Sequence, residues 1–216
     1  QAEAMEQGID GEFYRNDVDE LGPAVELDAA VTGTGHFRVY RDGSGYPKME
    51  RAYPLEVLVG QRDGFYGDPK CLYHLHAMDR EVVLEMFEGD SKVQRAIKEA
   101  KLASKIAFPF IILDSSVEQI MVVEAYRAAN QKGKNGKYVM AVQGDVLQST
   151  EWTRGLPYIP RRWKTRQQGY WGSGIVEELR PMQMEINYTL EKIQYILHNV
   201  STVRHWVQGG GKISLK

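Results

Sequence analysis

The most regular pattern in the chain is an apolar repeat near its C-terminal end. Between residues 173 and 207, large apolar side chains recur in steps of three or four residues, which is the period of an α-helix. The stripe consists of Leu179, Met182, Ile186, Leu190, Ile193, Leu197 and Val200. Such a helix would measure about 45 Å at 1.5 Å per residue, which is long for a domain of this size. We therefore expect the stripe to pack against copies of the chain or against other long helices.

The start of this helix carries conflicting signals. Ser173 is a candidate N-cap, and Glu177 and Glu178 lie in the first turns, where the helix dipole favours acidic side chains. Pro181 follows one turn too late for an easy place at the N-terminus. The sequence therefore predicts either a helix start near Arg180 or a kink at the proline.

Alternation of apolar and polar residues predicts strands earlier in the chain. Residues 36–40, 49–53 and 55–59 are expected to form a small antiparallel meander around a turn at residues 42–45. Further strands are expected at residues 72–76, 120–126 and 138–142, the last two as a hairpin. Residues 107–113 are apolar and predict a strand or a core loop.

Short helices are expected between these strands. Asp79 is a good N-cap for a helix through Phe87, and Ser91 is expected to cap a second helix through Ala103. Pro23 is expected to interrupt a helix in the N-terminal region or to open the next one. Together these elements predict an α+β fold, in which antiparallel strands and helices mix and one long helix follows.

Composition limits the class of protein. Of 216 residues, 43% are apolar and 26% are charged, as in an ordinary folded chain. No run approaches the roughly 18 consecutive apolar residues that a membrane span needs. Cys71 is the only cysteine, which excludes an internal disulfide and a multi-cysteine zinc site. The net charge of −2 gives no overall footprint for nucleic acid.

Charge is nevertheless unevenly distributed. Residues 1–30 carry nine acidic residues against one base, Arg15. Residues 154–171 are basic and aromatic, and two prolines predict an extended, irregular conformation. The cations of this segment are Arg161, Arg162, Lys164 and Arg166, interleaved with Tyr158, Trp163, Tyr170 and Trp171. Such a segment could bind single-stranded nucleic acid, or it could lie over the acidic N-terminal region with its aromatic rings buried.

The sequence contains only incomplete versions of known catalytic and ligand-binding motifs. The triplet at Ser173 lacks the first glycine of a nucleophile elbow, and residues 133–137 lack the spacing of a phosphate-binding loop. His74 and His76 are spaced to share one strand face, as two metal ligands would be, but no third ligand stands at a telling spacing. We therefore expect no enzymatic activity, no cofactor and no metal site.

Four motifs resemble, in the same order, those of portal proteins of tailed bacteriophages. Residues 171–187, with Trp171-Gly172-Ser173-Gly174 followed by two acids and a leucine, resemble the family's wing-to-stem segment. Residues 28–35 resemble its D-A-A-x-x-G-T-G stretch, and residues 66–83 resemble its Y-G-x-P-x-x-L-Y…D-R-E-V segment. Gly136-Lys137-Tyr138 and the later Trp152 fall in the expected positions. The similarity runs from about Asp28 to Lys216.

The resemblance implies a structural role. Portal proteins form a ring, usually of twelve subunits, at one capsid vertex, through which double-stranded DNA is packaged and ejected without sequence-specific contacts. Their partners are the major capsid protein, the terminase, which supplies ATP hydrolysis, and head-tail adaptor or tail proteins. The resemblance also implies assembly in the host cytoplasm, a place in the virion at the portal vertex, and no membrane.

The resemblance also divides the chain. Residues 1–172 would form a wing-like region, residues 173–207 a stem helix and residues 208–216 the start of a clip region, in a chain that we expect to be a piece of a longer protein. Candidate DNA-facing or subunit-contact cations are Arg161, Arg162, Lys164, Arg166, Lys192, Arg204 and Lys212. Two alternatives remain, another oligomeric head-tail structural protein and a nucleic-acid-binding domain that uses residues 154–171.

Overall fold

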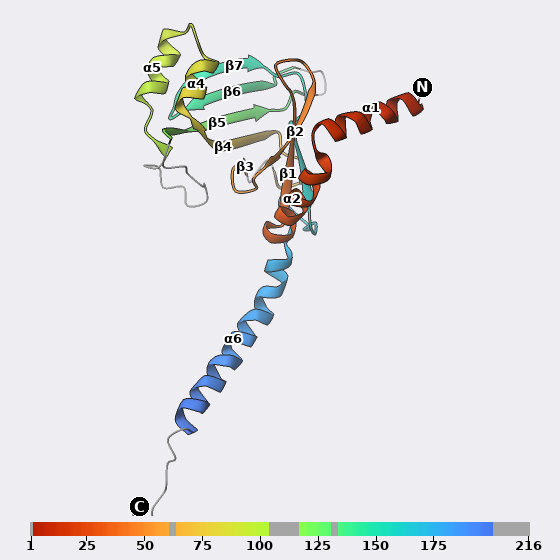
Figure 1. Cartoon of the computed structure of the whole chain (residues 1–216), viewed down its shortest axis with the longest axis vertical. Helices are drawn as coiled ribbons and strands as arrows, with labels where there is room; N and C mark the ends of the chain where they lie inside the picture. The colour runs from red at the N-terminus through yellow and green to blue at the C-terminus, as the bar shows by residue number, and fades with distance from the viewer. Residues whose placement is uncertain (1, 61–63, 104–116, 131–133, 201–216) are drawn as a thin grey trace, which may run out of the picture. The chain divides into compact units, whose positions relative to one another are not determined.

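The computed structural model describes residues 2–60, 64–103, 117–130 and 134–200 (Figure 1). Helices and antiparallel sheets mix in an α+β fold, as the sequence predicts. The chain divides into two compact units, Gln1–Ile175 and Val176–Lys216. The apolar run at residues 107–113 and the C-terminal residues 201–216, which include Arg204 and Lys212, lie outside the described residues.

The first unit contains a five-stranded antiparallel sheet in the order β3-β4-β5-β6-β7. Its strands are β3 (Val57–Val59), β4 (Cys71–Asp79), β5 (Gln119–Arg127), β6 (Lys137–Val142) and β7 (Asp145–Glu151). The predicted β5–β6 hairpin is confirmed, with Val123 opposite Ala141. The third strand of the predicted meander is wrong, because β3 pairs with β4 rather than with the hairpin before it.

Two short helices lie over one face of this sheet (Figure 1). These are α4 (Arg80–Met86) and α5 (Ser91–Glu99). Val83 of α4 and Ile97 of α5 are fully buried with Ile120 and Val122 of β5 in one apolar cluster, which fixes the helices on the sheet. The Asp79 N-cap is confirmed. The second cap is Asp90 rather than Ser91, because the Asp90 carboxylate accepts the backbone N–H groups of residues 92 and 93.

A second, three-stranded sheet has the order β2-β1-β8. Its strands are β1 (Thr34–Arg41), β2 (Pro47–Ala52) and β8 (Tyr158–Arg162). The predicted β1–β2 hairpin is confirmed, and the Asp42 carboxylate accepts two backbone N–H groups in its turn. The irregular conformation predicted for the basic segment is wrong over β8, which pairs with β1 although it contains Pro160.

The N-terminal region is helical. Helices α1 (Ala2–Arg15) and α2 (Val18–Thr32) precede the sheets, and α2 continues through Pro23. The predicted interruption is therefore wrong. Proline removes a single backbone donor, and the burial of Val25 and Ala29 on the same helix offsets that loss.

The long helix that the apolar period predicts is α6 (Ile175–Val200), and all of it except Ile175 belongs to the second unit. It begins two residues after Ser173, whose N–H donates to the Lys164 carbonyl in a β-bridge instead of starting the helix. The Ser173 cap and the start near Arg180 are therefore both wrong, and α6 continues through Pro181. Across the described residues, every helix is too short or too polar to cross a membrane.

Candidate functional site

The apolar stripe of α6 is exposed along the described helix. Six of its seven residues, Leu179, Met182, Ile186, Leu190, Ile193 and Leu197, are between 47% and 66% exposed. The side chain of Val200 is outside the described residues. A continuous row of large exposed apolar side chains is typical of a surface that is covered in an assembly.

The polar side of α6 carries charges of both signs. Glu177 and Glu178 lie in its first turn, and the ammonium of Lys192 lies 4.3 Å from the centroid of the Tyr188 ring. Lys192 is thus partly occupied by a cation–π contact within its own helix. The described helix has no concentrated basic stripe that would hold phosphate strongly.

Two of the motifs that carry the family resemblance meet in the first unit, although they are far apart in the sequence. Gly33 ends α2 in the left-handed conformation, at φ 96°. The N–H of Gly172 donates to the Thr34 hydroxyl at 2.8 Å, and a Cβ on Gly172 would lie 2.3 Å from the Gly33 carbonyl oxygen. Gly174 lies equally close to the end of α2, where a Cβ would stand 2.6 Å from the Ala30 carbonyl oxygen. The segment just before α6 therefore packs backbone against backbone on the end of α2.

His36 lies fully buried beside this contact. Its Nε2 is 3.0 Å from the Tyr170 hydroxyl, and its ring stacks on Tyr170 and meets Trp171 edge to face. Burial, followed by the charges of Arg162 and His74, lowers the pKa of His36 to about 4. The imidazole is therefore neutral at physiological pH and acts as a polar core residue.

The basic aromatic segment makes mostly internal contacts. Arg161 forms a two-point ion pair with Glu26 of α2, at 2.7 and 3.1 Å. Arg162 donates to the Tyr170 carbonyl at 2.6 Å, and Arg166 donates to the Gly172 carbonyl at 3.3 Å. The rings of Tyr158 and Tyr170 are buried. Of these contacts, the Arg161–Glu26 pair reaches the acidic N-terminal region, whereas Trp163 and Trp171 are 42% and 37% exposed. The interpretation in which the segment lies over that region with its rings buried is therefore supported in part.

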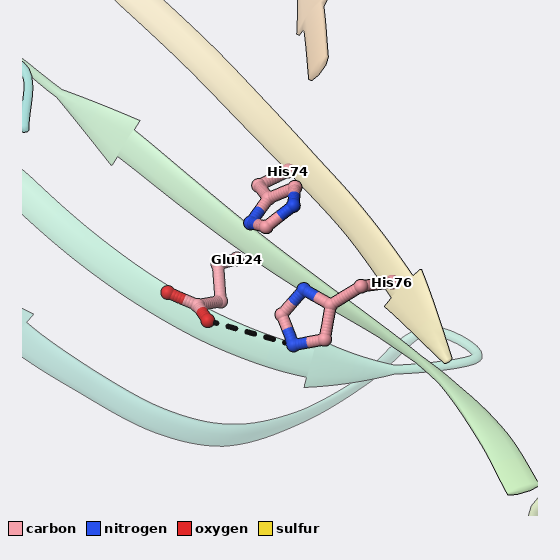
Figure 2. Close-up of side chains that lie close together, drawn as sticks. All are labelled: His74, His76 and Glu124. Atoms are coloured by element: carbon pink, nitrogen blue, oxygen red, sulfur yellow. Dashed lines mark ion pairs between the residues drawn. The ribbon is translucent and has the colours of Figure 1, made fainter. Parts of the chain in front are cut away.

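The structure adds a third residue to the histidine pair. His74 and His76 share one face of β4, and Glu124 of β5 lies directly opposite His74 in the strand register. One ligand atom from each of these three residues lies within 4.8 Å of the others, and Figure 2 shows the three side chains converging on one face of the sheet. Sequence reasoning missed Glu124, although it is the only charged residue within the apolar run 120–126.

This polar cluster separates two apolar ones. Leu72 and Tyr126 pair at one end of the β4–β5 face and belong to a core shared with β8. Beyond the histidines, Val122 and Ile120 belong to the core beneath α4 and α5. A buried carboxylate between apolar clusters is costly unless it is paired. Arg38 of β1 supplies the partner, since its guanidinium donates to Glu124 Oε2 at 2.7 Å.

Hydroxyl groups complete the surroundings of Glu124. The Tyr126 hydroxyl donates to Oε2 at 2.6 Å, and the Tyr138 hydroxyl approaches the same oxygen at 3.4 Å. Burial, together with the negative charge of Glu124, raises the pKa of both tyrosines, so that both remain protonated donors. Burial, and then the neighbouring His74, lowers the pKa of His76 to about 4.

Comparison with known proteins does not place the chain in a family. No protein-family model matches the chain, and no curated protein sequence matches it. Function is therefore inferred from the residues and from how the fold places them.

Proposed function

We propose that the chain is a structural subunit of a portal ring at the capsid vertex of a tailed bacteriophage. The observation that carries the proposal is the exposed apolar stripe of α6, which extends from Leu179 to Leu197. Burying one side chain of this size stabilises an interface by roughly 1.5–3 kcal/mol. Repeated contacts of this kind between neighbouring subunits favour a closed ring.

The glycine contact before α6 supports the same proposal. The resemblance to portal proteins depends partly on residues 28–35 and 171–174. These segments lie in contact through Gly33 and Gly172. In a portal this contact would hold in place the segment that leads into the stem helix.

The mechanism is physical and needs no catalytic group. A channel must let a polyanion pass without holding it, which a neutral or mixed surface allows and a strongly basic surface prevents. The mixed charges of α6 meet this requirement. The ring, usually of twelve subunits in the family that the chain resembles, would dock the terminase during packaging and the adaptor or tail proteins afterwards, with the major capsid protein around it.

Substitutions in the stripe test the proposal. Ile186→Asp or Ile193→Asp places a charge on the apolar face and should abolish ring assembly, because an unpaired charge at a closed interface is costly. Asn199→Asp introduces the same charge on another side of the helix and is the matched control. Light-scattering mass of the full-length proteins should show rings for the control and small species for the two stripe variants.

Intact rings of both isoleucine variants would contradict the proposal. Another oligomeric head-tail protein would show assembly through α6 but no binding of the terminase. A nucleic-acid-binding domain would show a stable small species that binds single strands with a steep salt dependence.

A further inference from the structure

The first unit contains a candidate metal site, the cluster of His74, His76 and Glu124. We propose that these three residues bind a divalent transition-metal ion, with Zn²⁺ the best match. This inference does not depend on the portal proposal, because its three ligands come from β4 and β5 and none comes from α6.

The ligand types fit this ion. Two imidazoles and one carboxylate form a common zinc ligand set, and His and carboxylate ligands together suit Zn²⁺ better than Ca²⁺ or Mg²⁺, which prefer oxygen. The three ligand atoms within 4.8 Å of one another need to approach to about 3.4 Å for tetrahedral bonds of about 2.1 Å. The three side chains lie close together over the same face of the strands (Figure 2), and side-chain rotations would have to close this difference.

The buried nitrogens point to a ligand as well. His74 is 6% exposed, and within the part of the chain that the structure describes, the Nδ1 atoms of His74 and His76 are buried without a hydrogen-bond partner. A buried polar atom left unpaired costs about 1–3 kcal/mol. A bound metal ion would satisfy such an atom.

The surrounding groups are arranged as outer-shell partners. His74 Nε2 lies 3.4 Å from Glu56 Oε2, which leaves Nδ1 as the ligand and reproduces the carboxylate–histidine–metal arrangement of many zinc sites. Glu124 directs its hydrogen-bonded Oε2 to Arg38 and Tyr126, while Oε1 lies 3.7 Å from His76 Nε2. The ligating carboxylate is thus fixed from behind.

The local charge also favours a cation. The Glu124 carboxylate belongs to the cluster and the Glu56 carboxylate contacts His74, against one guanidinium, that of Arg38. A bound ion would join β4 to β5 at the boundary between the two apolar clusters. Through Glu124 and Arg38 it would also connect the five-stranded sheet to β1 of the second sheet.

Metal titration of the chelator-treated full chain tests the proposal. We expect one Zn²⁺ to bind per chain and His76→Gln to weaken binding at least tenfold. His36→Gln removes another buried histidine whose Nδ1 has no partner among the described residues, but it lies outside the cluster, so its affinity should equal that of the wild type. Equal weakening by both substitutions, or no binding to the wild type, would overturn the proposal.

A second measurement needs no variant and so does not depend on whether His76→Gln folds. Zn²⁺ that binds the native state raises the midpoint of thermal unfolding, and a chelator reverses the increase. Co²⁺ in the same site should give the visible absorption of a low-symmetry, four- or five-coordinate ion. A wild-type chain that shows neither the increase nor the absorption does not contain the site.

Discussion

Gly33 and Gly172 approach so closely that a Cβ on Gly33 would lie 2.4 Å from the Gly172 carbonyl oxygen. Real Cβ atoms do not tolerate such a contact with backbone, so the two chain segments must separate if either residue acquires a side chain. The contact joins the end of α2 to the segment that leads into α6.

Gly172→Ala should therefore destabilise the first unit by about 3 kcal/mol or more. Gly155→Ala is the matched control, because among the described residues nothing lies within 4 Å of its Cβ position; it should change the free energy of unfolding by less than about 1 kcal/mol. Denaturant unfolding measures both. Equal effects at the two glycines would show that the close approach does not constrain the fold.

Arg51 and Asp28 should respond unequally to truncation. Arg51 donates to both Asp28 oxygens, at 2.7 and 2.6 Å, and the Asp28 side chain is 6% exposed whereas that of Arg51 is 40% exposed. Arg51→Ala leaves a buried carboxylate unpaired and should cost about 3 kcal/mol. Asp28→Ala leaves a guanidinium that can reach solvent and should cost about 1 kcal/mol.

The control for this pair is Arg95→Ala. Arg95 and Glu99 form an exposed pair on α5, with side chains 79% and 65% exposed. Such pairs contribute little to stability, so Arg95→Ala should change the free energy of unfolding far less than Arg51→Ala. Denaturant unfolding of the three variants gives the comparison. A larger loss for Asp28→Ala than for Arg51→Ala would reverse the expected order.

Stability should fall in acid partly because of His36. Its pKa is about 4 in the folded chain and 6.5 when it is unperturbed. Between these values the unfolded state binds a proton that the native state does not, so this contribution is complete above pH 6.5 and is lost as the pH falls toward 4. At the acid end the loss is about 3 kcal/mol.

His36→Gln isolates this effect from other titrating groups. The difference in unfolding free energy between the wild type and the variant should shrink or change sign as the pH is lowered from 7 to about 4. Parallel stability curves for the two proteins would mean that His36 does not titrate as its burial requires.

The basic segment should contribute to folding contacts rather than to nucleic-acid affinity. Arg161 is paired with Glu26, and both side chains are partly exposed. Arg161→Ala should therefore change single-strand affinity by less than about twofold and have little effect on the free energy of unfolding. Fluorescence anisotropy of a labelled oligonucleotide at low and high salt measures the affinity, with Arg95→Ala as the control. A selective loss for Arg161→Ala would favour the nucleic-acid alternative.

Local patterns predicted much of the fold. The period of α6, the Asp79 cap and the β5–β6 hairpin all depend on residues close in sequence, and the structure contains each of them. The pairing of β3 with β4 was not predicted, because local alternation identifies a short strand but does not say which sheet edge it joins. The helix interruption predicted at Pro23 was wrong because the burial of α2 side chains outweighs the loss of one backbone N–H donor.

Of the two candidate sites, one could be predicted from local sequence and the other could not. The stripe of α6 is visible as a period in the sequence, and its exposure in the structure agrees with an intermolecular role. Glu124 could not be placed beside His74 from the sequence, because the strand register depends on how β4 and β5 align across the long stretch between Asp79 and Gln119. The only signal in the sequence that Glu124 has a special role is that it is the one charged residue in the apolar run 120–126.

Assembly into a ring through α6 is the property on which the proposed function depends. Negative-stain microscopy of the full-length protein, with its mass measured by light scattering, tests that property most directly. We expect closed rings around a central hole, with about the twelve subunits that are usual in the family that the chain resembles. A stable monomer or dimer at all salt concentrations would contradict the proposed function.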